Sequence, residues 1–264
     1  MSVCQGCVWD ELELDGAPAD VPVAIGGRLE PATVLCGYRH ATYPMPSASA
    51  AQTEANHFLY EESVAAGTTV VLDSPLPDPY ALTWWSPDPR PVIPYGRMYK
   101  SRETRRLVRS KLPWTTTANQ AFDQVLAECR RDRSPEWLTV ELCECMVELH
   151  RQGWAHSAEV WEHGELVGGT VGIGAGIVFG LDSCFRRRSN ASKVAMLDME
   201  HRLAGTGVTL LDAEWDSEVN RRLGARPIPR REFLTALAHS GDPVRPAGGE
   251  EDVQRLAFPR TPPE

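Results

Sequence analysis

The stretch VTLLDAEWDSEVNRRLGARPIPR, which runs from Val208 to Arg230, decides how the rest of this 264-residue chain is interpreted. Its first half alternates apolar and polar residues, the pattern of a strand with one buried face. Side chains repeat every two residues along a strand, so Asp212 and Glu214 are predicted to share one face with Val208. Two carboxylates that close resist joint ionisation, and one pKa should rise. The alternative is an acidic strand end that is simply exposed.

The composition indicates a globular chain. Hydrophobic residues make up 42% of the sequence, enough for one large domain or two small ones. No run of about 18 apolar residues occurs, so no transmembrane helix is expected. The acidic start, MSVCQGCVWDELELD, lacks the apolar segment of a signal peptide. We therefore expect a cytoplasmic protein with no membrane partner.

Seven scattered cysteines are typical of a reducing compartment. Cys4 and Cys7 form one C-x-x-C pair, but a structural zinc site needs four ligands and no second such pair follows. Cys143 and Cys145 are separated by only one residue. We therefore expect no metal site.

The net charge is −9, but one segment is strongly basic. Between Lys100 and Lys111, KSRETRRLVRSK contains six cations and one anion. Its arginines are spaced by three and four residues, so a helix would align them in one stripe: Arg102, Arg105, Arg106 and Arg109. A solvated helix face is the alternative, but a stripe in an acidic chain favours contacts with the phosphates of a nucleic acid.

The predicted elements indicate an α+β fold. Helices are expected over residues 118–131, 139–152 and 189–204, and strands over 157–162, 165–172 and 176–180. Helices, an antiparallel meander, a helix and then a strand follow the order of N-acetyltransferase-like (GNAT-like) folds, with a mixed, mostly antiparallel sheet. Such folds admit ligands between the meander and that last strand, which is an analogy of fold and not of function.

A domain boundary is expected near WWSPDPRPVIP, where three prolines follow paired tryptophans. Residues 1–88 then form a small N-terminal domain with an insertion at about 47–80, and residues 89–264 form the GNAT-like domain. The Pro- and Gly-rich tail from Gly241 is expected to be mobile.

With these motifs in view, the chain resembles the leucyl/phenylalanyl-tRNA–protein transferase family from about Pro22 to Phe258. The motifs that carry the resemblance are AIGGRLEP at 24–31, WWSPDPR at 84–90, LHRQGWAHSAEVW at 149–161, ELVGG at 165–169, LDAE at 211–214 and LGARPIPRREF at 223–233. The resemblance implies transfer of an amino acid from aminoacyl-tRNA to an amine acceptor, such as the N-terminal Arg or Lys of a protein. It implies no cofactor, and it makes the arginine stripe a clamp on the tRNA acceptor stem. Coenzyme A is disfavoured because FRRRSNASK, at the start of the next helix, lacks a glycine phosphate loop.

Several positions depart from the family pattern. Glu214 stands where the family has Gln, and a glutamate there would accept a proton outright. The other departures gather where the substrates would meet: Met45 for Trp, Met146 for Tyr, Asp182 for Glu, Cys184 for Met and Val219 for His.

The resemblance predicts Asp212 and Glu214 as catalytic residues. The terminal adenosine is expected near Trp137 and the loop from Tyr38 to Met45, and Asp182 is expected to bind an ammonium group. Cys184 is interpreted as pocket lining, since no histidine stands beside it in the sequence. The full predicted substrate-binding set is Tyr38, Met45, Trp137, Met146, Phe179, Asp182, Cys184, Phe185 and Ser217.

Three hypotheses follow. The first, which the clustered departures favour, is a recruited paralog that joins the aminoacyl group to a small molecule or peptide in natural-product biosynthesis. The second is an ordinary leucyl/phenylalanyl-tRNA–protein transferase. The third is an inactive protein that only binds aminoacyl-tRNA, although two carboxylates on one strand argue against it.

Overall fold

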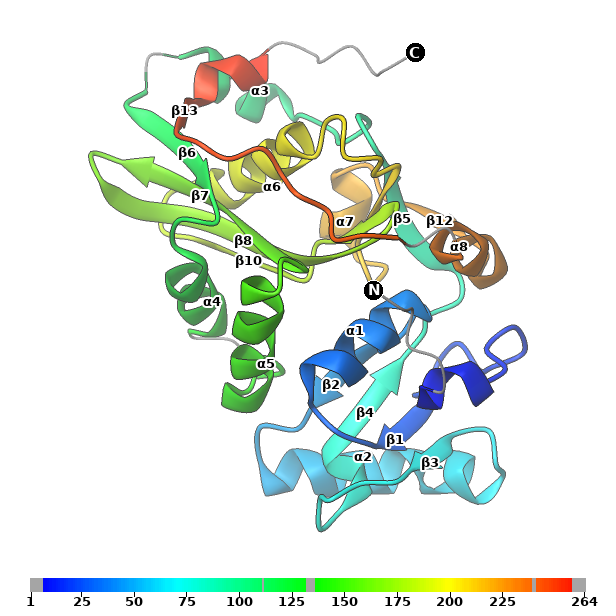
Figure 1. Cartoon of the computed structure of the whole chain (residues 1–264). Coiled ribbons are helices and arrows are strands. Elements are labelled where there is room, and N and C mark those ends of the chain that lie inside the picture. Colours follow the sequence, from blue (N-terminus) through cyan, green and yellow to red (C-terminus); the bar gives the residue numbers. More distant parts are fainter. Residues whose placement is uncertain (1–6, 111, 132–135, 239–240, 258–264) are drawn as a thin grey trace.

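The computed structural model describes residues 7–110, 112–131, 136–238 and 241–257, and it is an α+β structure with two β-sheets (Figure 1). The smaller sheet comes from the first third of the chain and has the strand order β2-β4-β1-β3. Its strands are β1 (Ala24–Gly26), β2 (Tyr43–Pro46), β3 (Val70–Leu72) and β4 (Leu82–Trp85). It is a mixed sheet, since β1 pairs parallel with β3 and antiparallel with β4.

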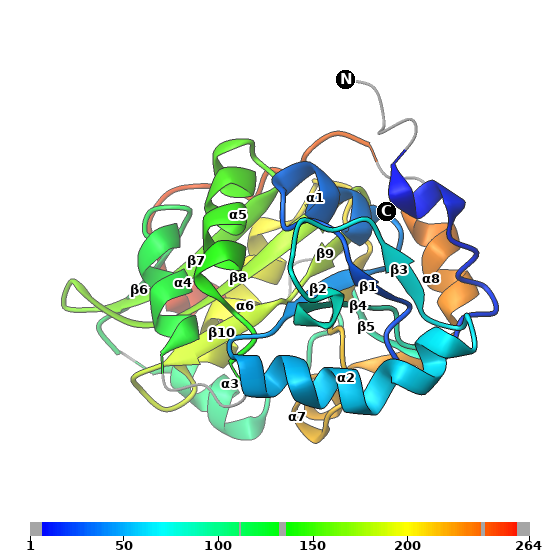
Figure 2. The same ribbon diagram turned by 90° about the horizontal axis from the view of Figure 1, so that it is seen from below.

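Two helices accompany the smaller sheet. Helix α1 (Pro31–Arg39) lies between the two sheets and contacts α5 and β8 of the larger unit. Helix α2 (Ala50–Ala65) covers the outer side of the small sheet and buries none of its residues (Figure 2). Two short turns, η1 (Val8–Glu11) and η2 (Pro79–Ala81), complete this part.

The larger sheet has the strand order β12-β5-β11-β9-β8-β7-β6-β13, with β10 paired beside β8. Its strands are β5 (Arg90–Pro94), β6 (Trp114–Ala118), β7 (Ala155–Glu162), β8 (Glu165–Ala175), β9 (Val178–Gly180), β10 (Ser183–Arg186), β11 (Leu210–Asp212), β12 (Arg226–Ile228) and β13 (Glu251–Asp252). Strands β7, β8 and β9 form the expected antiparallel meander, and β6 extends it beside β7. Strand β11 then inserts parallel to β9 and antiparallel to β5.

Helices cover both faces of this sheet. Helix α6 (Ala191–Arg202) packs on one face, and α4 (Phe122–Arg130) and α5 (Val140–Arg151) pack on the other (Figure 1). Helix α3 (Arg102–Arg109) and the turn η3 (Val253–Ala257) pack against α6. Helices α7 (Glu218–Arg222) and α8 (Arg230–Leu237) follow β11 and β12.

Strand β8 changes its partner along one edge, which opens the sheet. Gly168–Val171 pair with β10, whereas Gly174 and Ala175 pair with β9. A Cβ atom on Gly172, at the change-over, would lie 1.8 Å from the carbonyl oxygen of Gly180, so only glycine fits there. The link between β9 and β10 crosses this gap and carries Asp182.

The predicted secondary structure is largely confirmed, with identifiable misses. Strands β6 and β10 were not expected, and the helix predicted from residue 118 begins only at Phe122. The strand predicted from Val208 is shorter, since β11 ends at Asp212. Short strands carry too few periods to be recognised from alternation alone.

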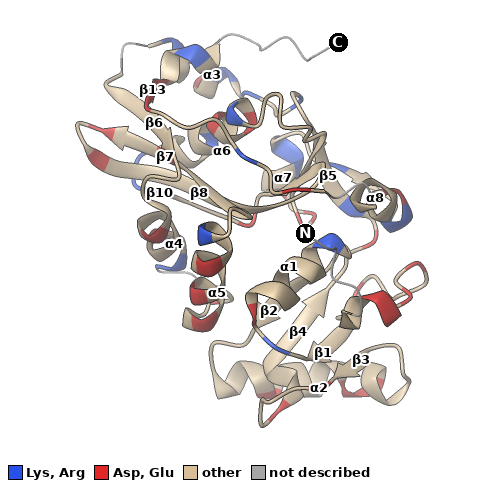
Figure 3. Cartoon of the chain, in the orientation of Figure 1, with Lys and Arg blue, Asp and Glu red and all other residues tan. Residues whose placement is uncertain are grey.

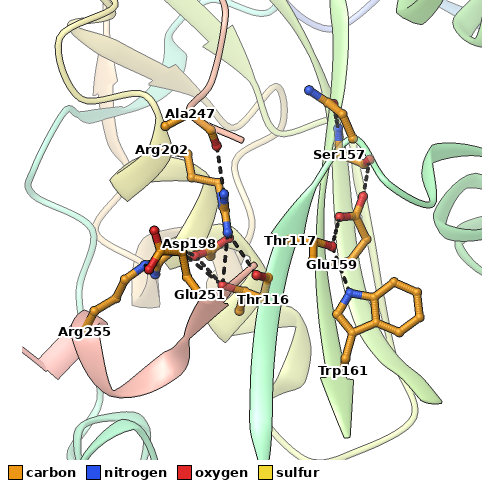
Figure 4. A network of polar contacts seen from close by, with 11 residues as sticks. Thr116, Thr117, Ser157, Glu159, Trp161, Asp198, Arg202, Ala247, Glu251 and Arg255 are labelled. Atoms are coloured by element: carbon orange, nitrogen blue, oxygen red, sulfur yellow. Dashed lines mark hydrogen bonds and ion pairs between the residues drawn. The ribbon is translucent and has the colours of Figure 1, made fainter. Parts of the chain in front are cut away.

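The expectation of a mobile tail from Gly241 is wrong for the part that the structure describes. Strand β13 pairs with β6, and Val253 and Leu256 are fully buried. In Figure 4, Asp198 of α6 is held between Arg202 and Arg255, so the tail is joined to the core by buried charges. These residues are buried by contacts with segments far away in the sequence, so no local sequence pattern indicates their burial.

The cysteines also differ from expectation. Cys7 and Cys36 are joined in a disulfide, whereas Cys129, Cys143, Cys145 and Cys184 are free. Among the described residues, no helix combines the length and the apolar character that a membrane span requires.

Candidate active site

A buried ion pair between Arg90 and Asp212 lies at the end of β11. The Nε and Nη2 atoms of Arg90 donate to the two carboxylate oxygens of Asp212 at 2.9 and 2.5 Å. Both side chains are about 2–3% exposed. Burial alone would lower the pKa of Arg90, but the Asp212 carboxylate raises it overall, so the guanidinium stays charged. The pair arises because β5 and β11 are antiparallel neighbours.

The same guanidinium is fixed from three further sides. The rings of Tyr43 and Phe233 lie 4.8 and 4.9 Å from its central carbon, and its Nη1 atom donates to the carbonyl of Ala41. These contacts join the small sheet, the large sheet and helix α8 at one point. Sequence reasoning missed Arg90 as a site residue, although it ends the motif WWSPDPR.

Glu214 lies close to Asp212 because the chain turns after β11, and not because the two residues alternate along one strand. The strand has ended, and Glu214 has φ +59°, the left-handed region. Its backbone N–H donates to Oδ1 of Asp212 at 3.0 Å, and its side chain is buried. Glu214 and Asp212 are therefore close together, as predicted. They do not share one face of a strand, however, which was the reason given for the prediction.

The Glu214 carboxyl also lies beside a second acid, Asp182, which sequence reasoning did not pair with it. Neither carboxylate oxygen of Asp182 has an N–H donor within hydrogen-bond distance in the described chain, and its side chain is buried. The groups beside it are the Glu214 carboxyl and the Tyr38 hydroxyl. Two buried carboxyl groups this close disfavour joint ionisation, which favours the neutral form of at least one of them.

Burial and charge shift both carboxyl groups in the same direction. Burial first, and then the charges of Glu214 and Asp212, raise the pKa of Asp182 well above its usual range. Burial and the Asp212 charge raise the pKa of Glu214 to about 8. Asp212 itself is neutralised by Arg90. The prediction that one pKa would rise is thus met by Glu214, and the pKa of Asp182 rises as well.

Tyr38 supports this pair from helix α1. Its hydroxyl donates to Oε1 of Glu214 at 3.4 Å. Burial first, and then the charge of Asp182, raise the pKa of Tyr38, so the hydroxyl remains a donor at neutral pH. Helix α1 of the small sheet therefore reaches into a site built mainly by the large sheet.

A cavity of about 390 Å³ opens in front of the carboxyl pair. It lies where β8 changes partner, between the β9–β10 link and the segment after β11. Its lining residues are Met45, Trp137, Leu181, Asp182, Ser183, Cys184, Met196, Ala213, Glu214, Trp215, Val219, Asn220 and Leu223. This volume is within the usual range for a small-ligand pocket.

The structure brings only part of the predicted substrate-binding set to this cavity. Met45, Trp137, Asp182 and Cys184 line it, together with the catalytic candidate Glu214. The others lie elsewhere. Tyr38 is behind Glu214, Met146 and Phe179 are in the core, Phe185 lines a different cavity with Cys129 and Arg187, and Ser217 caps helix α7.

Trp215, which sequence reasoning missed, stands at the mouth of this cavity. Its side chain is 39% exposed, and its ring lies 5.1 Å from Trp85 and 5.9 Å from Tyr43. An exposed indole that is held by two buried or half-buried rings offers a rigid stacking surface. Its position directly after Glu214 was the available signal.

The arginine stripe forms as predicted. Helix α3 is rich in basic residues (Figure 3) and exposes Arg102, Arg105, Arg106 and Arg109. These four arginines line one surface depression of about 700 Å³. None of the four has an ion-pair partner in the described part of the chain, and Arg105 stacks over Tyr99. Helix α3 packs on α6, and Met196 of α6 lines the cavity with the carboxyl pair.

Comparison with known proteins adds independent information. A family model described as leucyl/phenylalanyl-tRNA protein transferase matches residues 92–238, which include Asp182, Asp212 and Glu214. A protein of that name from Shewanella pealeana is 35% identical over 83% of this chain and 81% of its own. Another from Shewanella sp. strain ANA-3 is 35% identical over 85% of this chain and 84% of its own. A third, from Shewanella halifaxensis, is 34% identical over 83% of this chain.

Proposed function

The chain belongs to the leucyl/phenylalanyl-tRNA protein transferase family, and we propose that it transfers an aminoacyl group from aminoacyl-tRNA to the N-terminal amine of a protein. It is an enzyme, an aminoacyltransferase. The names of the relatives support this ordinary family activity better than the recruited-paralog hypothesis that the sequence favoured. Residues 1–88 would form the small N-terminal domain, and residues 89–264 the GNAT-like domain that performs the transfer.

The carboxyl pair of Asp182 and Glu214 is the observation that carries this proposal. Both groups are buried at the cavity wall, and the neighbouring cation, Arg90, is already engaged by Asp212. The described residues that line the cavity include no cation, and carboxyl groups in such a site favour a ligand that brings positive charge. An N-terminal ammonium group, or the side chain of an N-terminal Arg or Lys, has that charge.

The pair also suits the proton transfer that amide formation requires. The amine nitrogen bonds to the carbonyl carbon of the aminoacyl ester, and the bond from that carbon to the ribose oxygen breaks. The proton lost by nitrogen passes to Glu214 and then to the leaving ribose hydroxyl. General base catalysis of this kind contributes about 10²- to 10⁴-fold, and positioning of the amine supplies the rest.

The tRNA would be held at two places. The unpaired arginines of α3 fit the phosphates of the acceptor stem, despite the overall charge of −9. Trp215 and Trp137, at the mouth and wall of the cavity, fit the terminal adenine by stacking. The aminoacyl side chain would then enter the cavity beside Met45 and Cys184, so no other acyl donor or cofactor is needed.

A small-molecule amine as acceptor remains the second candidate, and Glu214 is the observation that favours it. The resemblance places an amide at this position in the family, and an amide cannot share a proton with Asp182 as a second acid can. An acid pair tolerates an acceptor that is more strongly basic or differently charged from a protein N-terminus.

The two candidates are separated by the acceptor. The full chain is incubated with tRNA charged with leucine or phenylalanine and a peptide that begins with Arg, and the products are analysed by mass spectrometry. We expect the peptide to gain one Leu or Phe residue, while a matched peptide with an acetylated N-terminus stays unchanged. No peptide product, together with new amides in a small-molecule extract, would establish the second candidate. No amide at all, with tRNA still bound, would leave a binding protein.

A further inference from the structure

The disulfide of Cys7 and Cys36 lies beside a histidine, at a cavity that shares no lining residue with that of the carboxyl pair. The two sulfur atoms and a ring nitrogen of His40 all lie within 4.8 Å of one another. Cys7 precedes the turn η1, Cys36 lies within helix α1, and His40 caps the end of that helix. Sequence reasoning weighed only the spacing of cysteines along the chain, so it missed a cluster that the fold assembles.

Helix geometry and a carboxylate fix the histidine against the disulfide. Cys36 and His40 are four residues apart, so they lie on the same side of the helix, one turn apart. Nδ1 of His40 lies 3.9 Å from the Cys36 sulfur and 2.8 Å from the Cys36 carbonyl oxygen, and Nε2 lies 3.0 Å from Oδ1 of Asp10. Both ring nitrogens therefore face acceptors. A neutral imidazole has only one N–H, so this arrangement favours the protonated ring, which donates from both nitrogens.

A protonated histidine makes the neighbouring sulfur a better leaving group. The thiolate is the reactive form of cysteine, and a nearby imidazolium stabilises it. In thiol–disulfide exchange, the departing sulfur leaves faster when its thiolate is stabilised. Because His40 contacts the Cys36 sulfur, Cys36 is suited to depart when the bond is attacked.

An attacking thiol has access to the bond from the side of Cys7. The Cys36 side is 1% exposed, whereas Cys7 is half-buried. Both residues line an open cavity of about 380 Å³, a size that admits a small molecule. Among the described lining residues, one cation, Arg28, stands against one anion, Asp73. Access and chemistry therefore agree on attack at Cys7 and departure of Cys36.

Two free cysteines of the same chain provide a contrast. Burial raises the pKa of the Cys143 thiol to about 11 and that of the Cys145 thiol to about 12. Thiols of this kind stay protonated at neutral pH and react slowly. Reactivity toward small thiols is therefore expected at the Cys7–Cys36 bond and not at Cys143 or Cys145.

We propose that the Cys7–Cys36 bond is a reversible exchange site for low-molecular-weight thiols. The thiolate of the small molecule attacks the Cys7 sulfur and forms a mixed disulfide, and the Cys7–Cys36 bond breaks with its electron pair on Cys36. The Cys36 thiolate is held by His40. A second small thiol then attacks the small-molecule sulfur of the mixed disulfide, so that Cys7 leaves as a thiolate. Two small thiols thus supply two electrons and two protons and become one small disulfide, and the reverse reaction restores the bond.

The fold keeps the two sulfur atoms together when the bond is open. Trp9 is buried, its indole N–H donates to the carbonyl of Thr33 in α1, and its ring packs against Trp84 at 4.6 Å. The backbone N–H of Cys7 donates to Oδ2 of Asp10 at 3.1 Å. These contacts hold the turn η1 on helix α1 without the disulfide, so the bond re-forms between groups that are already in position.

The exchange changes the restraint on a helix that reaches the carboxyl pair. Tyr38 lies on α1 between Cys36 and His40, and it donates to Glu214. The open bond removes one of the links between this helix and the turn η1. The exchange does not rest on the proposed transfer reaction, and it is measured without tRNA.

Mass spectrometry of the full chain tests the proposal. The protein is equilibrated at neutral pH with mixtures of reduced and oxidised glutathione, quenched with acid, and labelled with an alkylating reagent. We expect the Cys7–Cys36 bond in oxidising mixtures, a glutathione adduct on Cys7 at intermediate ratios, and two more free thiols in reducing mixtures. Cys143 and Cys145 should carry no glutathione.

Variants locate the groups that favour the exchange. His40→Gln removes the cation beside Cys36, so the rate constant for reduction by glutathione should fall by about tenfold. Asp10→Asn should slow the reduction less, since it removes only the carboxylate that orients the ring. A merely structural role of Asp10 would lower the thermal unfolding midpoint and leave this rate constant unchanged. Cys143→Ser and the exposed His57→Gln are matched controls that should react as the parent does.

Three results would overturn the proposal or a part of it. A Cys7–Cys36 pair that stays entirely oxidised, or entirely reduced, in every glutathione mixture is no reversible exchange site. A rate constant for His40→Gln within about twofold of the parent would remove the histidine from the reaction. An adduct found on Cys36 in place of Cys7 would reverse the assigned direction of attack.

Discussion

The Arg90 guanidinium donates two hydrogen bonds, of 2.9 and 2.5 Å, to the Asp212 carboxylate, and both side chains are almost completely buried. The two residues are 122 positions apart in the chain. This pair neutralises one acid of the site, whereas the pKa values of Glu214 and Asp182 are raised. It also joins the small sheet to the large one through the contacts of Arg90 with Tyr43 and Ala41.

Removal of one member of this pair should destabilise the protein strongly. Arg90→Met leaves the Asp212 charge buried without a partner, and breaking such a pair costs about 3–5 kcal/mol in the free energy of unfolding. The double variant Arg90→Met with Asp212→Leu should lose much less than the sum of the single losses. Urea denaturation followed by circular dichroism measures all three. Additive losses would contradict the coupling.

Replacement of Glu214 should separate its chemical role from its shape. Glu214→Gln keeps the volume and the hydrogen bond from Tyr38 but removes the exchangeable acid proton. If Glu214 accepts the proton, the single-turnover rate should fall by about two to four orders of magnitude with tRNA affinity unchanged. A variant within about threefold of the parent at every pH would rule out this role.

The pH profile provides a second measure of the same group. Since burial raises the pKa of Glu214 to about 8, the parent rate should rise with pH as the carboxyl pair loses its proton. A protein N-terminal amine also titrates at about 7.7–8.0, so the parent profile alone is ambiguous. The Gln variant should retain only the amine step, and identical profiles for the two proteins would argue against the pair.

Stability should depend on the same ionisation with a definite sign. The pKa of Glu214 is raised from 4.5 to about 8 on folding, so between these values the folded state binds more protons than the unfolded state. The free energy of unfolding should therefore fall as pH rises through this window. The Glu214→Gln variant lacks this contribution. From pH 5 to pH 8, its free energy of unfolding should therefore rise relative to that of the parent by on the order of a few kcal/mol. A constant difference across the window would show that the pKa is not shifted.

Charge removal on helix α3 should weaken tRNA binding and its salt dependence together. Changing Arg102 and Arg106 to Ala should lower the slope of log affinity against log salt by about one for each lost phosphate contact. Arg151→Ala, an exposed arginine at the end of α5, is the matched control. Filter binding at several salt concentrations decides the point, and an unchanged slope would remove α3 from the tRNA interface.

Local patterns predicted the longer elements of the large sheet and its helices correctly. Helices α3, α5 and α6 and the meander β7–β8–β9 follow from periodicity and turn residues over segments long enough to show them. The arginine stripe on α3 is a property of one short segment and was found for the same reason. Strands such as β10 and β11, of only three or four residues, are decided by their neighbours in the sheet.

The sequence by itself determined the family and the charge pattern, and it predicted that Asp212 and Glu214 lie close together, because these depend on residue types at fixed spacing. Tertiary structure alone decided that Asp182 lies beside Glu214, which it reaches through the gap where β8 changes partner. It also decided that Arg90 neutralises Asp212 and that Cys36 and His40 lie beside Cys7. Protonation and thiol chemistry act over a few ångströms of space, and in a folded chain that distance is set by packing between segments far apart in sequence.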